Sequence, residues 1–393
     1  MRNVGLKTGI ALFFLLFFSL EGSASYNVTK RYSLLEDRLK TQDILVPFGR
    51  NIYADFRGTL NTGIFSMIKD VMGLTDSASA NSFISRNNGT EQGGSFSWDS
   101  GTPFSRFKLF GMRFYPQLGF HGSGGAVLGF QEAELTRDTI LAIIPSQFHA
   151  MLPSGVPVKG QDLGTWSGIA ALSAYKTPEN TMFHFYGQFQ SQISALLEWS
   201  YRKRYYGHLK FYTLVRQDTK LIRGIEDLSK GGIGSDFGGN LHANLTTDLK
   251  LGYRKSKWRI FYQLEGLPLL SLLQKKESST YFYGENLLMR FHGDYKFKVK
   301  GLSFKTFAGA HYRADHYDWS DGLYIGGEFG AAAFRGRLGV KTRLMIDPEH
   351  WNLGLKLKGW IGHIHYLAKF PFKSSVDGVR ISSFHTLNLR LFF

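Results

Sequence analysis

The segment HYRADHYDWSD, residues 311–321, is the densest gathering of side chains whose types could do chemistry. It holds two histidines and three aspartates, and imidazole and carboxylate groups can bind a divalent cation or act as an acid–base pair. A metal site needs three or four converging ligands, which sequence spacing does not show. Because the segment falls in an expected loop, where polar residues face solvent, we expect no metal site, no cofactor and no catalytic residue in it.

Other patterns of catalytic residues are weak. The serine of HGSGG (121–125) lies in an expected glycine-rich turn, not in the strand–turn–helix order of a G-x-S-x-G elbow, and no H-E-x-x-H occurs. The chain has no cysteine, which excludes thiolate metal sites and thiol catalysis. We therefore expect a function without covalent chemistry. The alternative is an enzyme that acts on envelope lipid or polymer through His316 and Asp318.

The first 25 residues have the three-part layout of a secretory signal peptide. Arg2 and Lys7 come first, an apolar run follows, and small residues occupy 22–25. The run is too short for a comfortable membrane span, so we expect cleavage near residue 24 or 25 and export. The formal net charge of +16 first suggests nucleic acid. An exported chain rarely meets nucleic acid, so we expect no such partner.

Alternation of apolar and polar residues dominates from residue 165 onward. In 287–299, apolar or aromatic side chains recur at every second position, and those between them are mostly charged: Arg290, His292, Asp294, Lys296 and Lys298. A soluble antiparallel sandwich also alternates, but its strands are usually about 5 or 6 residues long. Here several alternations are longer and no helices separate them. The pattern predicts an all-β fold, a transmembrane antiparallel up-and-down barrel.

The expected strands alternate between short and long connections. They lie at 165–175, 183–202, 207–216, 242–254, 257–266, 284–298, 302–313, 322–344, 351–366 and 381–393. Short connections fall at 203–206, 255–256, 299–301 and 345–350, provided that 322–344 is one bulged strand. Two or three further strands come from 106–115, 124–135 and 139–150. We expect about 12 strands over 101–393, with 10 or 14 as alternatives.

Residues 26–100 differ from the rest of the chain. Ile64, Met67, Ile68 and Val71 recur at helical spacing, which predicts a short helix near 62–72, followed by a polar stretch. We expect an N-terminal segment at 26–100 that lies in the periplasm or plugs the lumen.

Charge on the expected inner face is mostly positive. Basic residues that line a low-dielectric passage concentrate anions, so small anionic solutes are the expected partners. The candidate lumen-lining anion contacts are Lys250, Arg254, Arg290, Lys296, Arg335, Arg337, Lys341, Arg343, Lys356, Lys358 and Arg390. Some of these residues could instead pair with acids or with residues 26–100, and a non-conducting envelope protein with a filled lumen is a further alternative.

The terminal stretch LNLRLFF, together with the signal peptide and the alternation, resembles the Gram-negative outer-membrane β-barrel class. The resemblance is to the class and to no specific family. Members commonly end in an aromatic residue on a last amphipathic strand, which the barrel-assembly machinery recognises. The matching residues here are Leu387, Leu389, Leu391 and Phe393. The resemblance implies a passive channel or binding barrel in the outer membrane, in contact with outer-membrane lipids.

Overall fold

The computed structural model describes a large part of the chain. The described residues are 26–43, 52–64, 86–87, 89–131, 182–202, 204–224, 239–275, 287–299, 302–314, 316–333, 338–376 and 379–393. The expected signal peptide, the strands expected at 139–150 and 165–175 and nearly all of the helix expected near 62–72 lie outside them.

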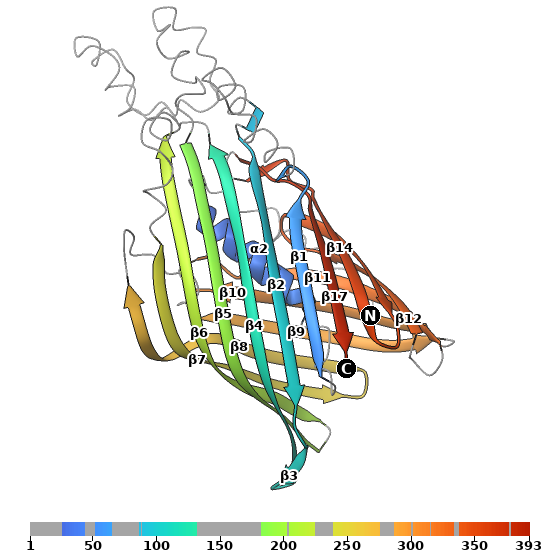
Figure 1. The fold of residues 1–393 in the computed structure, drawn as a ribbon. Coiled ribbons are helices and arrows are strands. Elements are labelled where there is room, and N and C mark those ends of the chain that lie inside the picture. Colours follow the sequence, from blue (N-terminus) through green and yellow to red (C-terminus); the bar gives the residue numbers. More distant parts are fainter. Residues whose placement is uncertain are drawn as a thin grey trace, which may run out of the picture.

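In the described part of the chain, fourteen antiparallel strands close into a barrel (Figure 1). Each strand pairs with its neighbour in the chain, and the first pairs with the last, so that Tyr53 lies opposite Phe392. The strands are β1 (Tyr53–Asn61), β2 (Glu91–Pro103), β4 (Met112–Gln131), β5 (Met182–Tyr201), β6 (Tyr205–Gly224), β7 (Asn240–Lys255), β8 (Trp258–Lys275), β9 (Leu288–Val299), β10 (Leu302–Arg313), β11 (Tyr324–Ala333), β12 (Leu338–Ile346), β13 (His350–Lys358), β14 (Gly362–Pro371) and β17 (Phe384–Phe392).

Short strands extend the barrel at two places. β3 (Phe107–Leu109) forms a hairpin with the start of β4, and β15 (Ser375–Val376) pairs with β16 (Val379–Arg380) between β14 and β17. The all-β barrel predicted from sequence is confirmed, with fourteen strands instead of about 12.

Connection lengths separate the two rims. Five short connections, which join β5 to β6, β7 to β8, β9 to β10, β11 to β12 and β13 to β14, lie on the same rim as the end of β17. The longer connections lie on the other rim, together with the tight turn at 347–349. Because outer-membrane barrels have short periplasmic turns and longer extracellular loops, the rim with the chain end is the periplasmic one.

Two of the expected strands are wrong. Residues within 322–344 form β11 and the start of β12, and residues 351–366 fall in β13 and β14, so that the chain reverses between Ala333 and Leu338 and again between Lys358 and Gly362. The alternation continues across both reversals, so periodicity alone did not reveal them. Each missed reversal changes the direction assigned to all the strands before it. Because there are two such reversals, the direction of the earlier strands is the expected one. The sidedness expected for the connections before 322 is therefore kept, whereas the turn expected at 345–350 on the periplasmic rim lies on the extracellular rim.

The wall has an apolar outer face and a polar inner face. Leu387 and Leu389 of β17 are exposed on the outside, as are Phe291 and Leu344 on β9 and β12. Residues at the alternate positions, such as Arg290 and Thr386, are buried inside. This alternation places the terminal leucines on the lipid-facing side of the wall.

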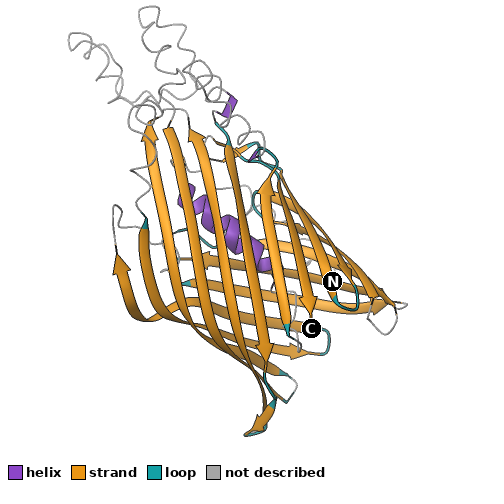
Figure 2. Ribbon diagram, in the orientation of Figure 1, coloured by secondary structure: helices purple, strands orange, loops and turns teal. Residues whose placement is uncertain are grey.

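A helix, α2 (Val28–Asp43), lies inside the barrel (Figures 1 and 2). Asn27 caps it, because its side-chain oxygen accepts hydrogen bonds from the backbone N–H groups of Thr29 and Lys30 at 3.1 Å each. Apolar residues of the helix, among them Val28, Tyr32 and Leu35, pack with Val127 of β4 and with other wall residues in one buried cluster.

The boundary expected at residue 101 differs from the structure. β1 and most of β2 precede residue 101 and belong to the barrel wall, so the N-terminal segment ends before β1. The strongest helical spacing in the sequence, near 62–72, did not mark α2, because α2 is mostly polar and its apolar side chains face only one part of the wall.

The apolar stretch LPLLSLL (267–273), expected as a loop, belongs to β8. Opposite β7, two of its leucines, Leu269 and Leu272, have no directly opposed residue, and register shifts mark these points as bulges. Extra residues of this kind increase strand twist and bend the strand. All five leucines of the stretch are exposed, which makes this part of the outer wall unusually rich in leucine.

Candidate functional site

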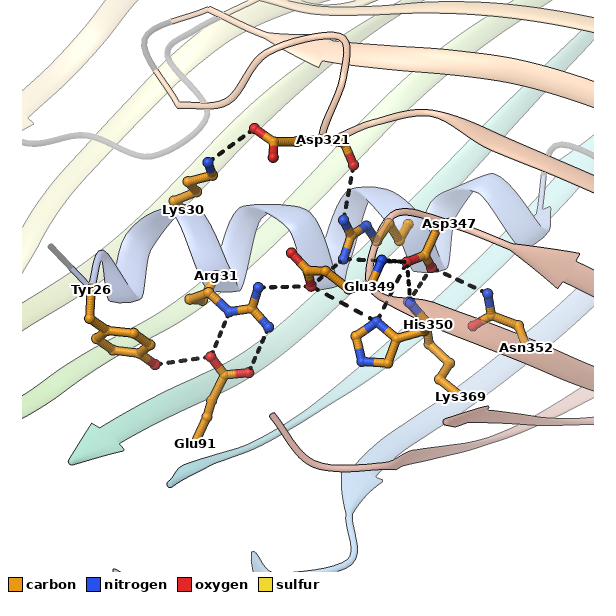
Figure 3. Close-up of polar contacts among 11 residues, drawn as sticks. Tyr26, Lys30, Arg31, Glu91, Asp321, Asp347, Glu349, His350, Asn352 and Lys369 are labelled. Atoms are coloured by element: carbon orange, nitrogen blue, oxygen red, sulfur yellow. Dashed lines mark hydrogen bonds and ion pairs between the residues drawn. The ribbon is translucent and has the colours of Figure 1, made fainter. Parts of the chain in front are cut away.

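Two arginines of α2 hold the helix against the extracellular end of the wall (Figure 3). Arg31 donates to Glu91 of β2 at 2.7 and 3.2 Å and to Glu349 at 2.8 Å. Arg38 donates to the same Glu349 oxygen at 2.8 Å and lies 3.7 Å from Asp347. Glu349 therefore bridges two turns of the helix, and its partners all lie away from solvent.

The turn at 347–349 is built to present its carboxylates to the helix. Asp347 accepts from the backbone N–H groups of Glu349 and His350 at 3.1 and 2.9 Å, and Lys369 lies 3.5 Å away. Burial alone would raise the pKa of Glu349, but the positive charges of Arg31 and Arg38 outweigh it and hold the pKa below its usual range. The carboxylates of this turn are therefore ionised when the helix is in place.

A further ion pair, at Asp37, also fixes the helix. Arg313 of β10 donates to both oxygens of Asp37 at 2.7 and 2.8 Å, and the Tyr317 hydroxyl donates to the same carboxylate at 2.7 Å. Burial would raise the pKa of Asp37, but the Arg313 guanidinium outweighs burial and lowers it. Since Asp37 is fully buried, this pair depends on the helix being docked.

The extracellular loop between β10 and β11 also contacts the helix. His316 Nδ1 lies 3.2 Å from Ser33 Oγ, Lys30 lies 3.0 Å from Asp321, and Arg38 donates to the Asp321 carbonyl at 2.9 Å. Burial lowers the pKa of His316 to about 4. Residues 316–321 of this loop therefore hold helix α2, the plug of the lumen, in place, and we call this segment the clasp.

This placement does not support the catalytic role considered for His316 and Asp318. Ser33, the hydroxyl beside His316, is fully buried and donates to the Thr29 carbonyl at 2.7 Å, so no substrate reaches it. Asp318 is exposed. Among the described residues, no group of three or more histidine or acidic side chains is arranged to hold a metal ion.

A polar cavity that is partly open to solvent separates the helix from part of the wall. It lies beside β5, β6, β8 and β10, and three glutamines of β5 form one side of it. The charged lining residues are Lys40, Arg216, Arg313, Glu36 and Glu265. Among the described residues, helix α2 therefore occupies the extracellular half of the lumen, with this polar cavity on one side of it.

The inner wall carries the basic residues predicted from sequence, so far as the structure describes them. Arg335 and Arg337 lie outside the described residues. The other predicted anion contacts all lie at inward positions of their strands: Lys250, Arg254, Arg290, Lys296, Lys341, Arg343, Lys356, Lys358 and Arg390. Arg290 belongs to the extracellular half, is fully buried and lies 3.5 Å from Glu265.

Several of these cations are paired with acids. The Glu328 carboxylate of β11 forms ion pairs with Lys341 at 2.7 Å, Arg343 at 2.9 Å and Lys305 at 3.3 Å. Arg390 binds Asp55. The pairing that the sequence left open as an alternative thus accounts for part of the charge, but one acid facing three cations leaves the local balance positive.

The periplasmic half of the lumen keeps an excess of positive charge over β12, β13, β14 and β17. Lys341 and Lys356 lie directly opposite each other, and Lys358 lies opposite His363. Lys341 and Lys356 therefore carry like charges at directly opposed positions, which destabilises a sheet.

The residues that sequence reasoning missed are those that hold the plug. Arg31, Arg38 and Asp37 lie in a polar stretch whose only local signal is the N-cap at Asn27. Glu349, which pairs with both arginines, is 318 residues from Arg31, and no periodicity connects the two. Among the described residues, no helix is long and apolar enough to span a membrane.

Comparisons with solved structures return outer-membrane barrels. The transport unit of the autotransporter AIDA-I from Escherichia coli has a TM-score of 0.38 and 8% identity, over 94% of this chain and 99% of that one. CdiB from Acinetobacter baumannii has a TM-score of 0.35 and 8% identity, over 88% of this chain and 60% of CdiB. The beta domain of the Bordetella autotransporter BrkA has a TM-score of 0.32 and 9% identity, over 87% of this chain and 99% of that one.

No protein-family model matches the sequence, and no curated protein matches it. The likeness to the solved structures concerns the barrel alone. The resemblance to the outer-membrane β-barrel class, with no specific family, is confirmed.

Proposed function

We propose that this outer-membrane β-barrel is a gated passage for small anionic solutes, closed in the resting state by helix α2. The observation that carries the proposal is the unequal charge of the lumen. In the periplasmic half of the described wall, inward cations outnumber inward acids: Lys210, Lys250, Arg254, Arg259, Lys296, Lys298, Lys305, Lys341, Arg343, Lys356, Lys358 and Arg390 against Asp55, Asp99, Glu198, Asp248, Asp294 and Glu328.

The excess charge attracts anions into the periplasmic half. A cleft lined by one sign of charge with low-dielectric walls raises the local concentration of counter-ions, and basic linings select anions in pores. Lys296, Lys298 and Lys358 are exposed to the lumen, so a solute can reach them. The functional unit is therefore the positively charged periplasmic half of the lumen, which ends at helix α2.

Helix α2 provides the gate. Its arginines balance the acids of the extracellular half, Glu91, Asp347 and Glu349, so that the helix is held by charge as well as by packing. Conduction then requires that these ion pairs break. Removing one partner of a buried ion pair costs about 3–5 kcal/mol, so substitutions at these arginines favour the open state.

Planar-bilayer recordings in a salt gradient test both parts of the proposal. We expect low conductance for the native chain, and a higher, anion-preferring conductance for the double variant Arg31→Ala, Arg38→Ala. Adding Lys356→Glu to this variant shifts the reversal potential toward cation preference. Adding Lys255→Glu instead, which makes the same charge change on an outward position at the same rim, leaves it nearly unchanged.

A cation-preferring reversal potential in the double variant contradicts the proposal. Absence of any conductance increase, with the variant still folded by heat-modifiable mobility on a denaturing gel, supports the non-conducting alternative, in which the plugged barrel serves an envelope or interaction role.

A further inference from the structure

Three side chains on the inner wall of β2 and β4 are joined by consecutive hydrogen bonds. Asp99 Oδ1 lies 2.7 Å from His121 Nδ1, and His121 Nε2 lies 3.1 Å from Ser123 Oγ. A carboxylate, an imidazole and a hydroxyl joined through the two different ring nitrogens form the arrangement of a serine hydrolase triad, which is recognised by geometry and not by order in the sequence. The serine belongs to HGSGG (121–125), which lies within strand β4 and not in a turn.

The hydrogen bonds around the serine fix the direction of its proton. The Asp99 carboxylate accepts from Nδ1–H, which leaves His121 Nε2 as an acceptor for the Ser123 hydroxyl. Gln190 Nε2 donates to Ser123 Oγ at 2.9 Å, so the hydroxyl oxygen already accepts one bond and its own proton points to the imidazole. This is the arrangement that a general base needs to activate a hydroxyl.

The register of the sheet makes the arrangement rigid. Asp99 lies directly opposite His121, and Gln190 lies directly opposite Ser123 on the other side. His121 and Ser123 are two residues apart on one strand and so face the same side. A constellation built on paired strands is held more precisely than one on loops.

A neighbouring carboxylate does not compete with Asp99. Asp55 of β1 lies opposite Asp99, but it accepts from Asn388 and Arg390. The two acids therefore have separate partners, and Asp99 is left to orient His121. Its side chain is 38% exposed and that of His121 17%, so the lumen reaches the carboxylate and the imidazole, whereas Ser123 is 9% exposed.

The cavity between the wall and α2 borders Gln190, whose amide donates to Ser123 Oγ, whereas Ser123 and His121 do not themselves line it. Its lining includes Gln190 and Gln192, the residues opposite Ser123 and His121, and continues to Lys40 and Arg216. Three cations and two acids line the space, together with Tyr32, Tyr212 and Leu214. A ligand that fits this lining is small, partly apolar and anionic at one end.

We propose that Ser123, His121 and Asp99 form a hydrolytic site in the lumen, for a small carboxylic ester with an anionic group. Ser123 Oγ attacks the ester carbonyl carbon while His121 Nε2 takes the hydroxyl proton. Gln190 Nε2, 2.9 Å from Oγ, is placed to donate to the oxygen on which negative charge develops. Collapse of the tetrahedral intermediate breaks the bond to the alkoxy oxygen, which leaves as the alcohol with the proton from His121.

Water completes the cycle. His121 Nε2 takes a proton from a water molecule, whose oxygen attacks the acyl carbon, and the proton returns to Ser123 as the acid is released. The net reaction is ester plus water to carboxylic acid plus alcohol. Ser123 and His121 are the catalytic residues, and Asp99 is a positioning residue that fixes the imidazole tautomer. This activity goes beyond the proposed passage and does not depend on it, since it requires no conduction.

A fluorophosphonate probe and p-nitrophenyl acetate test the site on the full-length folded barrel. We expect the probe to form an Oγ–P bond at Ser123, with loss of fluoride, located by peptide mass spectrometry. Ser123→Ala abolishes labelling, and Ser123→Ala and His121→Gln each lower kcat for the acetate by at least about 10³-fold.

Matched variants separate chemistry from folding. Ser97→Ala removes the hydroxyl directly opposite Ser123 on the same inner face, and it leaves labelling and turnover within about twofold of native. Asp99→Asn lowers kcat by on the order of 10²–10⁴-fold with little change in KM, because the wrong tautomer is held while the cavity is intact. Absence of label at Ser123 in the folded native barrel, or native turnover by Ser123→Ala, overturns the proposal.

Discussion

Arg38 joins three parts of the molecule through one guanidinium. It donates to Glu349 in the turn between β12 and β13 and to the Asp321 carbonyl in the loop between β10 and β11, and it belongs to the plug itself. Burial lowers the pKa of this arginine, but the charges of Asp347 and Glu349 outweigh burial and raise it. The plug is therefore held by groups that are charged over the whole physiological pH range.

Arg38→Ala is expected to loosen the plug by about 3–5 kcal/mol, because it leaves Glu349 and Asp347 buried with fewer partners. Thr29→Cys provides the reporter: Thr29 is 2% exposed in the docked helix and the chain has no other cysteine, so a thiol reagent reads undocking. Lys30→Ala, which removes a part-exposed pair with Asp321, is the control and changes docking by only about 0–1 kcal/mol. Equal labelling rates in both variants contradict this assignment.

The clasp at His316 gives the plug a dependence on pH. Docking lowers the pKa of His316 from 6.5 to about 4, so the docked form binds fewer protons than the undocked form. By linkage, the contribution of this contact is complete above about pH 6.5 and is lost as the pH falls toward 4. We expect the labelling rate of Thr29→Cys, taken relative to Thr29→Cys, His316→Asn at each pH, to rise between pH 6.5 and 4. A constant ratio over that window would sink the idea.

At the scale of the element, period two predicted which side of the wall each residue occupies but not where strands end. Lys356 and Arg390 were placed on the inner face correctly, because parity follows from strand geometry alone. The chain reversals between Ala333 and Leu338 and between Lys358 and Gly362 were missed, since the sequence alternation continues across them. Pairing such as Arg290 with Glu265 was not predictable either, because it depends on the register between β8 and β9.

The terminal strand carries a prediction that separates assembly from stability. Phe393 is 73% exposed, and its backbone N–H donates to the Ile52 carbonyl at 2.9 Å. Phe393→Ser keeps that hydrogen bond and removes only an exposed ring. We therefore expect refolding into lipid in vitro to be unchanged, whereas the assembled fraction in cells falls several-fold. Phe392→Ser, which alters a ring that packs on His363, is the comparison, and it is expected to weaken refolding in vitro as well.

At the scale of the whole molecule, the N-terminal part of the chain has two structural roles, one inside the lumen and one in the wall, where β1 pairs with β17 to form the seam. Residues 28–43 fill the lumen, whereas Tyr53–Asn61 complete the wall by pairing with Phe384–Phe392. Sequence patterning assigned both to one N-terminal segment, because β1 is short and its alternation is broken by Gly58. Closure of a barrel depends on its first and last strands, which no local signal joins.

Two truncations distinguish these parts. Deleting residues 26–43 removes the plug and leaves the wall complete, so we expect a folded, heat-modifiable barrel. Deleting residues 26–61 removes β1 and exposes the unpaired edges of β2 and β17, which lipid does not tolerate. That shorter chain is expected not to fold. A heat-modifiable band from the second deletion would show that the seam is not needed for closure.

The same seam constrains the order of events during biogenesis. Tyr53 pairs with Phe392, and Arg31 with Glu349, across nearly the whole length of the described chain. Contacts of such high sequence separation make folding slow, and strand edges that are still unpaired are prone to aggregate in the meantime. We therefore expect the chain to need protection from aggregation until these strands pair. The plug then docks as the barrel closes or enters a barrel that is already sealed, and time-resolved labelling of Thr29→Cys during assembly distinguishes these two routes.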